Sequence, residues 1–213
     1  MRSAGILVVT AVLCGCASLP VPADPASDAP EHRVVPGTPV SRYGSYREAL
    51  AAWRRPEDVN GWIGAMFEYD ADRSLRLSES QRAEGRAPSI VDPIAFHDKP
   101  KGVCVDLARF AVETLNHVTP ELKAKYLMIE FQPAVIRGQM LRRHWVALYA
   151  REGSLYVFAD SKRPGVIAGP YLTVADFIAE YARYRGREIV AYRELQSYKR
   201  RTRAISRQRL GDS

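Results

Sequence analysis

The chain is poor in cysteine, with 3 among its 213 residues. Two of them, Cys14 and Cys16, follow an apolar N-terminal stretch, and only Cys104 belongs to the part expected to fold. A lone cysteine there excludes an internal disulfide. The apolar stretch, Ile6 to Cys14, is too short to cross a membrane as a mature helix. Because Arg2 precedes it, residues 1–16 are predicted to be an export signal.

The end of this signal, Leu13-Cys14-Gly15-Cys16, resembles the lipobox of bacterial lipoproteins. The resemblance implies that Cys16 is lipidated and becomes the new N-terminus. Because Ala17 is not the aspartate associated with inner-membrane retention, it also implies sorting to the outer membrane, facing the periplasm. The alternative is an ordinary secretory signal cut nearby, after Ala17.

The two ends of the mature chain differ in composition from its middle. Residues 17–41 contain six prolines and no apolar period, which predicts a disordered tether. Residues 199–213 carry most of the net charge of +7. This basic tail either contacts anionic lipid or cell-wall polymer, or is a solvated disordered end. Nucleic-acid binding is not expected, because no recognition motif is present.

Residues 42–198 are long enough for one domain with a sizeable core. Apolar spacing predicts helices at 46–53, from Pro56 to about 66, from Val103 to about 115, and at 173–185. Strands are predicted at 126–131, 143–149, 154–159 and 188–192. Residues 88–102, with three prolines, are predicted to be irregular. Helices first and strands later indicate an α+β fold with a mainly antiparallel sheet.

Three residues in this order form a candidate catalytic set: Cys104 starting a helix, His144 on a strand and Asp160 ending the next strand. A helix N-terminus and an imidazolium lower the pKa of a thiol, and an aspartate can orient the imidazole. A three-residue hairpin loop, 151–153, would place His144 directly opposite Asp160. A slip of one residue would put the two on opposite faces.

These motifs resemble those of the transglutaminase-like superfamily, including the bacterial transglutaminase-like cysteine proteinases. The matches are Gly102-x-Cys104-x-Asp106-x-Ala108 opening a helix, His144-Trp145-Val146 on a strand, and Asp160 after the next strand. The resemblance implies a papain-like core and acyl transfer through a thioester.

Two departures limit that resemblance. Calcium-using relatives carry acids on both sides of the cysteine, where this chain has Val103 and Val105, so no metal or other cofactor is expected. Papain-like enzymes place an oxyanion glutamine shortly before the cysteine, where this chain reads Phe96-His97-Asp98-Lys99. The backbone N–H of Cys104 can supply one oxyanion donor, and the second is unidentified.

Several other residues have simpler interpretations. Asp106 is expected to stabilise the helix N-terminus rather than to act in catalysis. Trp145 should point into the core, and Tyr181 and Tyr184 are interpreted as core or surface aromatic residues. A lone loop histidine such as His97 is usually solvated.

The sequence therefore predicts a lipid-anchored thiol hydrolase, a protease or peptidase acting on a protein or peptide, cell-wall peptide included. Its membrane contact would be the lipid on Cys16. Two alternatives stay open: a transglutaminase, which passes the acyl group to an amine, and a non-catalytic module that binds peptide or cell-wall polymer.

Overall fold

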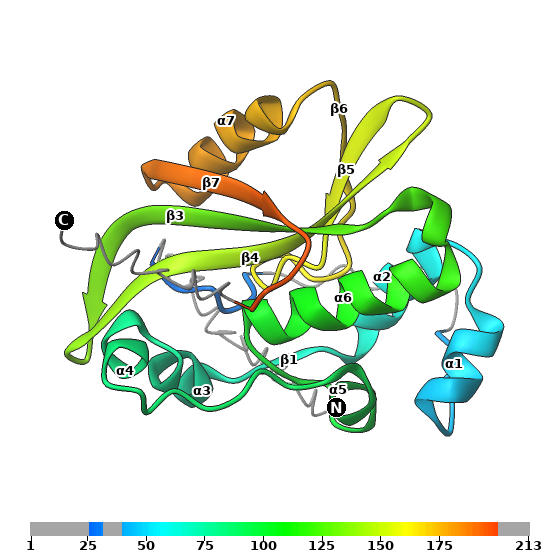
Figure 1. The fold of residues 1–213 in the computed structure, drawn as a ribbon, viewed down its shortest axis with the longest axis horizontal. Helices are drawn as coiled ribbons and strands as arrows, with labels where there is room; N and C mark the ends of the chain where they lie inside the picture. Colours follow the sequence, from blue (N-terminus) through cyan, green and yellow to red (C-terminus); the bar gives the residue numbers. More distant parts are fainter. Residues whose placement is uncertain (1–25, 32–39, 200–213) are drawn as a thin grey trace, which may run out of the picture.

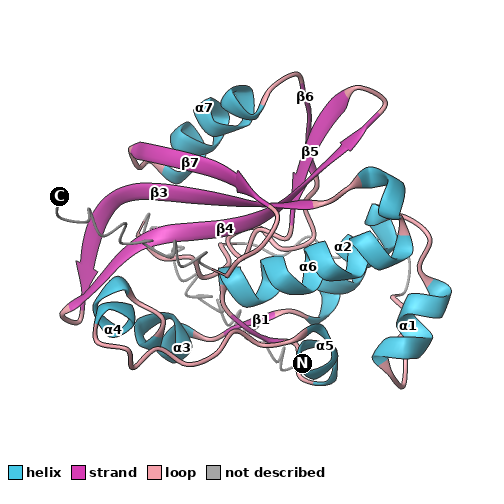
Figure 2. Cartoon of the chain, viewed as in Figure 1, coloured by secondary structure: helices cyan, strands magenta, loops and turns pink. Residues whose placement is uncertain are grey.

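An antiparallel sheet of five strands lies between one long helix on one face and a larger group of helices on the other (Figure 2). The computed structural model describes residues 26–31 and 40–199. The export signal, Cys16, most of the tether and the basic tail beyond Lys199 lie outside the described residues. The mixed α+β class predicted from the sequence is confirmed.

Seven helices and seven strands make up the described part of the chain (Figure 1). The helices are α1 (Tyr46–Ala52), α2 (Pro56–Met66), α3 (Ala71–Arg76), α4 (Glu79–Ala83), α5 (Pro93–Asp98), α6 (Cys104–Val118) and α7 (Val174–Arg185). The strands are β1 (Glu68–Tyr69), β2 (Lys101–Gly102), β3 (Lys125–Ile136), β4 (Gln139–Arg151), β5 (Ser154–Phe158), β6 (Ala168–Tyr171) and β7 (Ile189–Leu195). A short 3-10 turn, Pro120–Leu122, follows α6.

Alternation along the strands divides the apolar residues between two cores. In β4, Trp145, Ala147 and Tyr149 face the helices on the α6 side, whereas Val146 and Leu148 face α7. The strand order β6-β5-β4-β3-β7 places β4 in the middle of the sheet. β4 therefore contributes side chains to both cores, and the strand that carries His144 is held from both sides.

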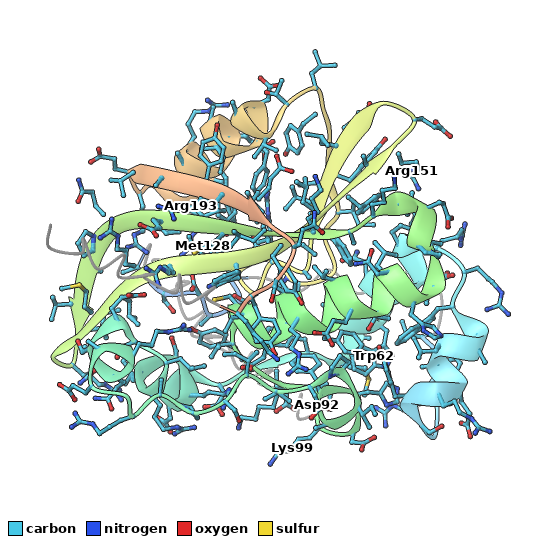
Figure 3. All side chains as sticks on the ribbon, in the orientation of Figure 1. Trp62, Asp92, Lys99, Met128, Arg151 and Arg193 are labelled. Carbon is cyan, nitrogen blue, oxygen red and sulfur yellow. The ribbon has the colours of Figure 1, made fainter. Side chains whose placement is uncertain are left out.

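The core on the α6 side is rich in aromatic rings. Trp62, labelled in Figure 3, packs against Phe110 with ring centroids 4.9 Å apart and stacks on His97 at 5.1 Å. His97 lies in α5 and is 8% exposed, so the expectation of a solvated loop histidine is wrong. Burial lowers the pKa of His97, which favours a neutral ring inside this core.

Residues 88–102 are more regular than their three prolines suggest. Pro93 is the first residue of α5, where a proline removes no hydrogen bond, and Asp92 caps that helix. Gly102 then pairs with Tyr69 in a short parallel ladder between β1 and β2. This ladder leads the chain directly into α6.

The hairpin between β4 and β5 differs by one residue from the predicted register. Arg151 pairs with Ser154, so the loop has two residues, Glu152 and Gly153, with φ of 52° and 78°. Two left-handed residues make the turn that matches strand twist. Ala147 pairs with Phe158, and continuing this register would set His144 opposite Ser161 rather than Asp160. The predicted three-residue loop is wrong.

No helix in residues 26–31 and 40–199 is long and apolar enough to cross a bilayer.

Candidate active site

Cys104 is the first residue of α6 and is 7% exposed. β4 pairs with β5 only from Ala147 to Arg151, so the β4 backbone at His144 and Trp145 has no β5 neighbour. The start of α6 meets β4 at this point. The His144 ring and the Trp145 backbone both lie close enough to the Cys104 thiol to lower its pKa. Figure 1 shows α6 running beneath β4.

The helix start is held by Asp106, whose carboxylate is fully buried. It accepts a hydrogen bond from the Val103 backbone N–H at 3.1 Å and another from Val91 at 2.9 Å. Arg73 donates to it through Nε at 2.7 Å and Nη2 at 2.8 Å. The expected role of Asp106 at the helix N-terminus is confirmed, and the ion pair with Arg73 is an addition that the sequence did not indicate.

Gly102 is required by the same arrangement. A Cβ on this residue would lie 2.9 Å from the Cβ of Asp106 and 3.1 Å from the ring of Phe96. The spacing Gly102-x-Cys104-x-Asp106 therefore has a structural cause: the carboxylate that caps the helix folds back under the glycine.

His144 and Asp160 form a buried pair, with Nε2 3.0 Å from the carboxylate Oδ1. The pair forms even though the predicted register is wrong. Ala159 adopts a left-handed conformation, with φ of 59°, directly after β5. This turn redirects the chain, so Asp160 leaves the strand alternation and points to His144.

Tyr181 of α7 completes this pair. Its hydroxyl donates to Asp160 at 3.0 Å, lies 3.0 Å from Nε2 of His144 and accepts from Nη1 of Arg185 at 3.1 Å. Burial, reinforced by the charge of Asp160, raises the pKa of Tyr181 well above its usual value, so the phenol stays protonated. Sequence reasoning interpreted Tyr181 as a core or surface aromatic residue and missed this role, because only the fold brings α7 to the site.

Asp160 is further fixed by its own chain neighbours. The Lys162 backbone N–H donates to Oδ1 at 3.0 Å and the Arg163 side chain to Oδ2 at 3.2 Å. Burial alone would raise the pKa of Asp160, but His144 and the two arginines Arg163 and Arg185 hold it below its usual range. The carboxylate is therefore charged and oriented toward the imidazole.

Asp28 is the unexpected member of the site. One nitrogen of His144, the sulfur of Cys104 and a carboxylate oxygen of Asp28 lie within 4.8 Å of one another. Nδ1 of His144 is 3.1 Å from Oδ2 of Asp28. Asp28 belongs to residues 26–31, which composition assigns to a disordered tether but which the structure places against the domain.

The charge of Asp28 changes the electrostatics of the pair it approaches. Burial alone would raise the pKa of Asp28, but His144 and Arg185 hold it well below its usual range. Burial and the charge of Asp28 raise the pKa of the Cys104 thiol, against the opposing effect of His144. Burial would lower the pKa of His144, but Asp28 and Asp160 raise it well above its usual value. The favoured state is a neutral thiol beside an imidazolium paired with Asp28.

The same three side chains offer sulfur, nitrogen and oxygen atoms of the types that zinc binds. A zinc ion there would occupy the thiolate and the imidazole lone pair. The site can therefore serve either a metal or a thiol nucleophile with its base, but not both at once. The hydrogen bonds on the other nitrogen of His144 suit a base as well as a ligand, since they fix the ring orientation.

A cavity of about 190 Å³ opens beside Cys104. Tyr69, Trp145, Phe131 and Asp28 are among the residues that line it. Trp145 is also buried in the core on the α6 side, as predicted. A substrate could thus reach the thiol from one side while the helix start closes the other.

The three predicted site residues, Cys104, His144 and Asp160, all meet here. The sequence did not indicate Asp28, which belongs to the segment 26–31, or Tyr181 and Arg185, which both belong to α7. No family model matches this chain, and a search of curated proteins found no match.

Proposed function

We propose that this protein is a cysteine-dependent amide hydrolase, a protease or peptidase. Cys104 is the nucleophile, His144 the general base and acid, and Asp160 the residue that orients the imidazole. One observation carries the proposal: the thiol at the start of α6 lies within 4.8 Å of an imidazole whose other nitrogen is 3.0 Å from a buried carboxylate. A nucleophile, a base and an orienting acid in that order are the groups that acyl transfer needs.

The reaction proceeds in two balanced halves. The reaction begins from a neutral His144, which requires that the imidazole no longer pairs with Asp28. His144 then takes the thiol proton as the sulfur bonds to the amide carbon. The C–N bond then breaks, and the same proton goes to the leaving amine, which leaves a thioester on Cys104. Water attacks the thioester with His144 as base, the C–S bond breaks, and the thiol regains its proton. Asp160 stabilises the imidazolium in both halves without taking a proton.

Two donors can stabilise the oxyanion. The N–H groups of the first turn of a helix have no partner inside that helix, and Cys104 belongs to this turn. Tyr69 lines the same cavity as Cys104, and its side chain hydrogen-bonds with Ser74. Burial raises the pKa of Tyr69 far above its usual value, so its hydroxyl keeps its proton. We propose Tyr69 as the second donor, because it is a protonated hydroxyl in the cavity that the substrate would enter.

The arrangement supports the resemblance to the transglutaminase-like superfamily and a papain-like core. A helix that begins with the nucleophile packs on an antiparallel sheet whose central strand carries the histidine. We further propose that Cys16 is lipidated and anchors the enzyme to the outer membrane, on the basis of Leu13-Cys14-Gly15-Cys16.

The test uses the full-length chain purified in detergent and a proteome-derived peptide mixture, with products identified by mass spectrometry. Wild type and Asp28→Ala are compared, because Asp28 lies beside the thiol. We expect new peptide ends with one or both, and none with Cys104→Ala or His144→Ala. His117→Ala is the matched control, since His117 is an exposed histidine near the far end of α6.

Cleavage that survives Cys104→Ala, or absence of cleavage with both wild type and Asp28→Ala, would overturn the proposal. A labelled primary amine added to the same mixture separates hydrolysis from transfer. Its incorporation in place of new ends would identify the protein as a transglutaminase. The mass of the purified chain reports whether Cys16 carries lipid.

A further inference from the structure

The segment 26–31, Ala-Ser-Asp-Ala-Pro-Glu, is bound at both of its ends. Arg185 donates to the Ser27 carbonyl at 3.1 Å and to the Asp28 carboxylate at 2.8 Å. At the other end, Glu31 donates its backbone N–H to the Lys162 carbonyl at 3.1 Å and pairs with the Lys162 ammonium at 3.1 Å. Tyr184 also donates to Glu31. Backbone and side chains are thus both recognised, as in a bound peptide.

The Asp28 carboxylate bridges two positive groups. Arg185 contacts Oδ1 and the His144 ring lies 3.1 Å from Oδ2. Its side chain is 15% exposed, so it has lost most of its water. A desolvated carboxylate is retained only where charged partners and hydrogen bonds offset that loss, and here each oxygen has its own partner.

Other contacts already hold the Arg185 side chain in the position that binds Asp28. It is 2% exposed, and its guanidinium is held by the Tyr181 hydroxyl. The same group lies 5.1 Å from the centre of the Phe131 ring and 5.6 Å from that of Tyr181. A guanidinium fixed between rings loses little further freedom when it binds an anion, and its fork of donors suits a carboxylate.

The cavity beside the thiol has the same charge preference. Its lining includes five arginines and two acids, one of which is Asp28 itself. The arginines are Arg82, Arg137, Arg142, Arg143 and Arg187. Glu79, the second acid, pairs with Arg143, and Glu130 nearby pairs with Arg142 and Arg143. Positive charge still exceeds negative charge around the space that a longer ligand would fill.

We infer that Arg185 is a specificity-determining residue whose guanidinium binds a carboxylate of an acidic peptide substrate, and that segment 26–31 occupies this subsite as an intramolecular ligand. The inference rests on the proposed function for its consequence, since a peptide bound here lies beside Cys104. A substrate carboxylate that displaces Asp28 takes over the contact with Arg185. It also releases His144 from Asp28, which leaves the imidazole to the thiol.

The test measures binding rather than turnover. The protein is the full-length chain carrying Cys104→Ala, so that nothing is cleaved, with Asp28→Ala and Glu31→Ala to release its own segment. The probe is the synthetic peptide Ala-Ser-Asp-Ala-Pro-Glu, capped at both ends and titrated by calorimetry. The matched probe carries asparagine in place of its aspartate, which changes the charge and keeps the shape.

We expect the aspartate peptide to bind at least about tenfold more tightly than the asparagine peptide, because a charge-assisted pair is lost. Arg185→Gln in the same background should remove that difference, and the probe pair remains decisive if this variant does not fold. Restoring Asp28 and Glu31 should weaken binding of the probe by competition. Equal affinity for the two peptides, or no binding of either, would overturn the inference.

The two proposals fail separately. Peptide binding with aspartate preference but no cleavage of any substrate would remove the hydrolase and keep the carboxylate subsite. Cleavage without a preference for acidic residues near the cut bond, with equal affinity for the two probes, would remove the subsite and keep the hydrolase.

Discussion

The two halves of the site are held together in different ways. On the side of the proposed nucleophile (the nucleophile side), Cys104 is fixed by Asp106 and Gly102, two residues away in the chain, and by the ion pair of Asp106 with Arg73. On the side of the proposed base (the base side), His144 is surrounded by Asp160, Tyr181 and Asp28, which come from three distant stretches of chain.

The two sides differ in whether a charged group can be replaced by one from a ligand. Asp106 and Arg73 both lie inside the folded domain, residues 42–198, so the two charges always neutralise each other. On the base side, one carboxylate belongs to segment 26–31 and its place can be taken by another anion. The nucleophile side therefore fixes the position of Cys104, whereas the proposed subsite would make the base side respond to a ligand.

The largest effect should come from the nucleophile side. Asp106→Ala leaves Arg73 and two backbone N–H groups without their buried acceptor. We expect the free energy of unfolding to fall by about 3–5 kcal/mol, the usual result of removing one partner of a buried pair. Denaturant unfolding followed by circular dichroism measures it.

Asp72→Ala is the control for Asp106→Ala, because Asp72 is an exposed acid in the first turn of α3. It should change stability by less than about 0.5 kcal/mol. If Asp106→Ala changed stability no more than this control, the buried ion pair would not fix the helix start.

Tyr181→Phe should have the next largest effect, because it acts inside the base side without removing a charge. The hydroxyl donates to Asp160 and accepts from Arg185, so its loss leaves two buried groups with one partner fewer. We expect a loss of about 1–3 kcal/mol in the free energy of unfolding. Tyr192→Phe, on an exposed tyrosine of β7, should leave stability unchanged. If the two variants changed the free energy of unfolding equally, the Tyr181 hydroxyl would not contribute to the hydrogen bonds around Asp160.

Asp28→Asn tests the exchangeable charge through the thiol. Burial and then Asp28 raise the pKa of Cys104, so removing the negative charge should lower that pKa. The thiolate then exists at lower pH, and the midpoint of Cys104 alkylation by iodoacetamide should move to lower pH. His144→Ala in the same background should move it back up, because the imidazolium that stabilises the thiolate is gone.

Asp98→Asn is the matched control for Asp28→Asn, since Asp98 is an exposed aspartate next to a histidine outside the site. Its alkylation profile should equal that of wild type. An unchanged profile for Asp28→Asn, measured beside this control, would show that Asp28 does not reach the thiol in solution.

The sequence predicted the nucleophile side well and the base side in part. Local signals placed Cys104 at a helix start, because apolar spacing and a capping acid act within a few residues. The contact between His144 and Asp160 was predicted from a hairpin register that is wrong by one residue. The contact still forms, because the left-handed conformation of Ala159 turns Asp160 toward His144. No local pattern marks such a residue, since alanine seldom adopts this conformation.

Asp28, Tyr181 and Arg185 could not be found in the same way. The composition of residues 17–41 favours a tether, and residues 26–31 bind the domain through partners that are distant in the chain, Arg185 and Lys162 among them. Tyr181 and Arg185 are four apart on α7 and reach the site through the packing of α7 on the sheet. Contacts of this kind depend on the tertiary packing, which cannot be predicted from the spacing of residues within one element.

The smallest effect should come from the β4–β5 turn, which sets the register between the two strands that lead to His144 and Asp160. Glu152 has φ of 52°, a conformation that asparagine adopts more readily than glutamate. Glu152→Asn should therefore raise the free energy of unfolding by about 0.5 kcal/mol, and thermal unfolding should show a small upward shift. Glu188→Asn, outside any turn of this kind, controls for the change in charge. A loss of stability with Glu152→Asn alone would mean that the turn is not of the two-residue type, and the register argument for Asp160 would have to be reopened.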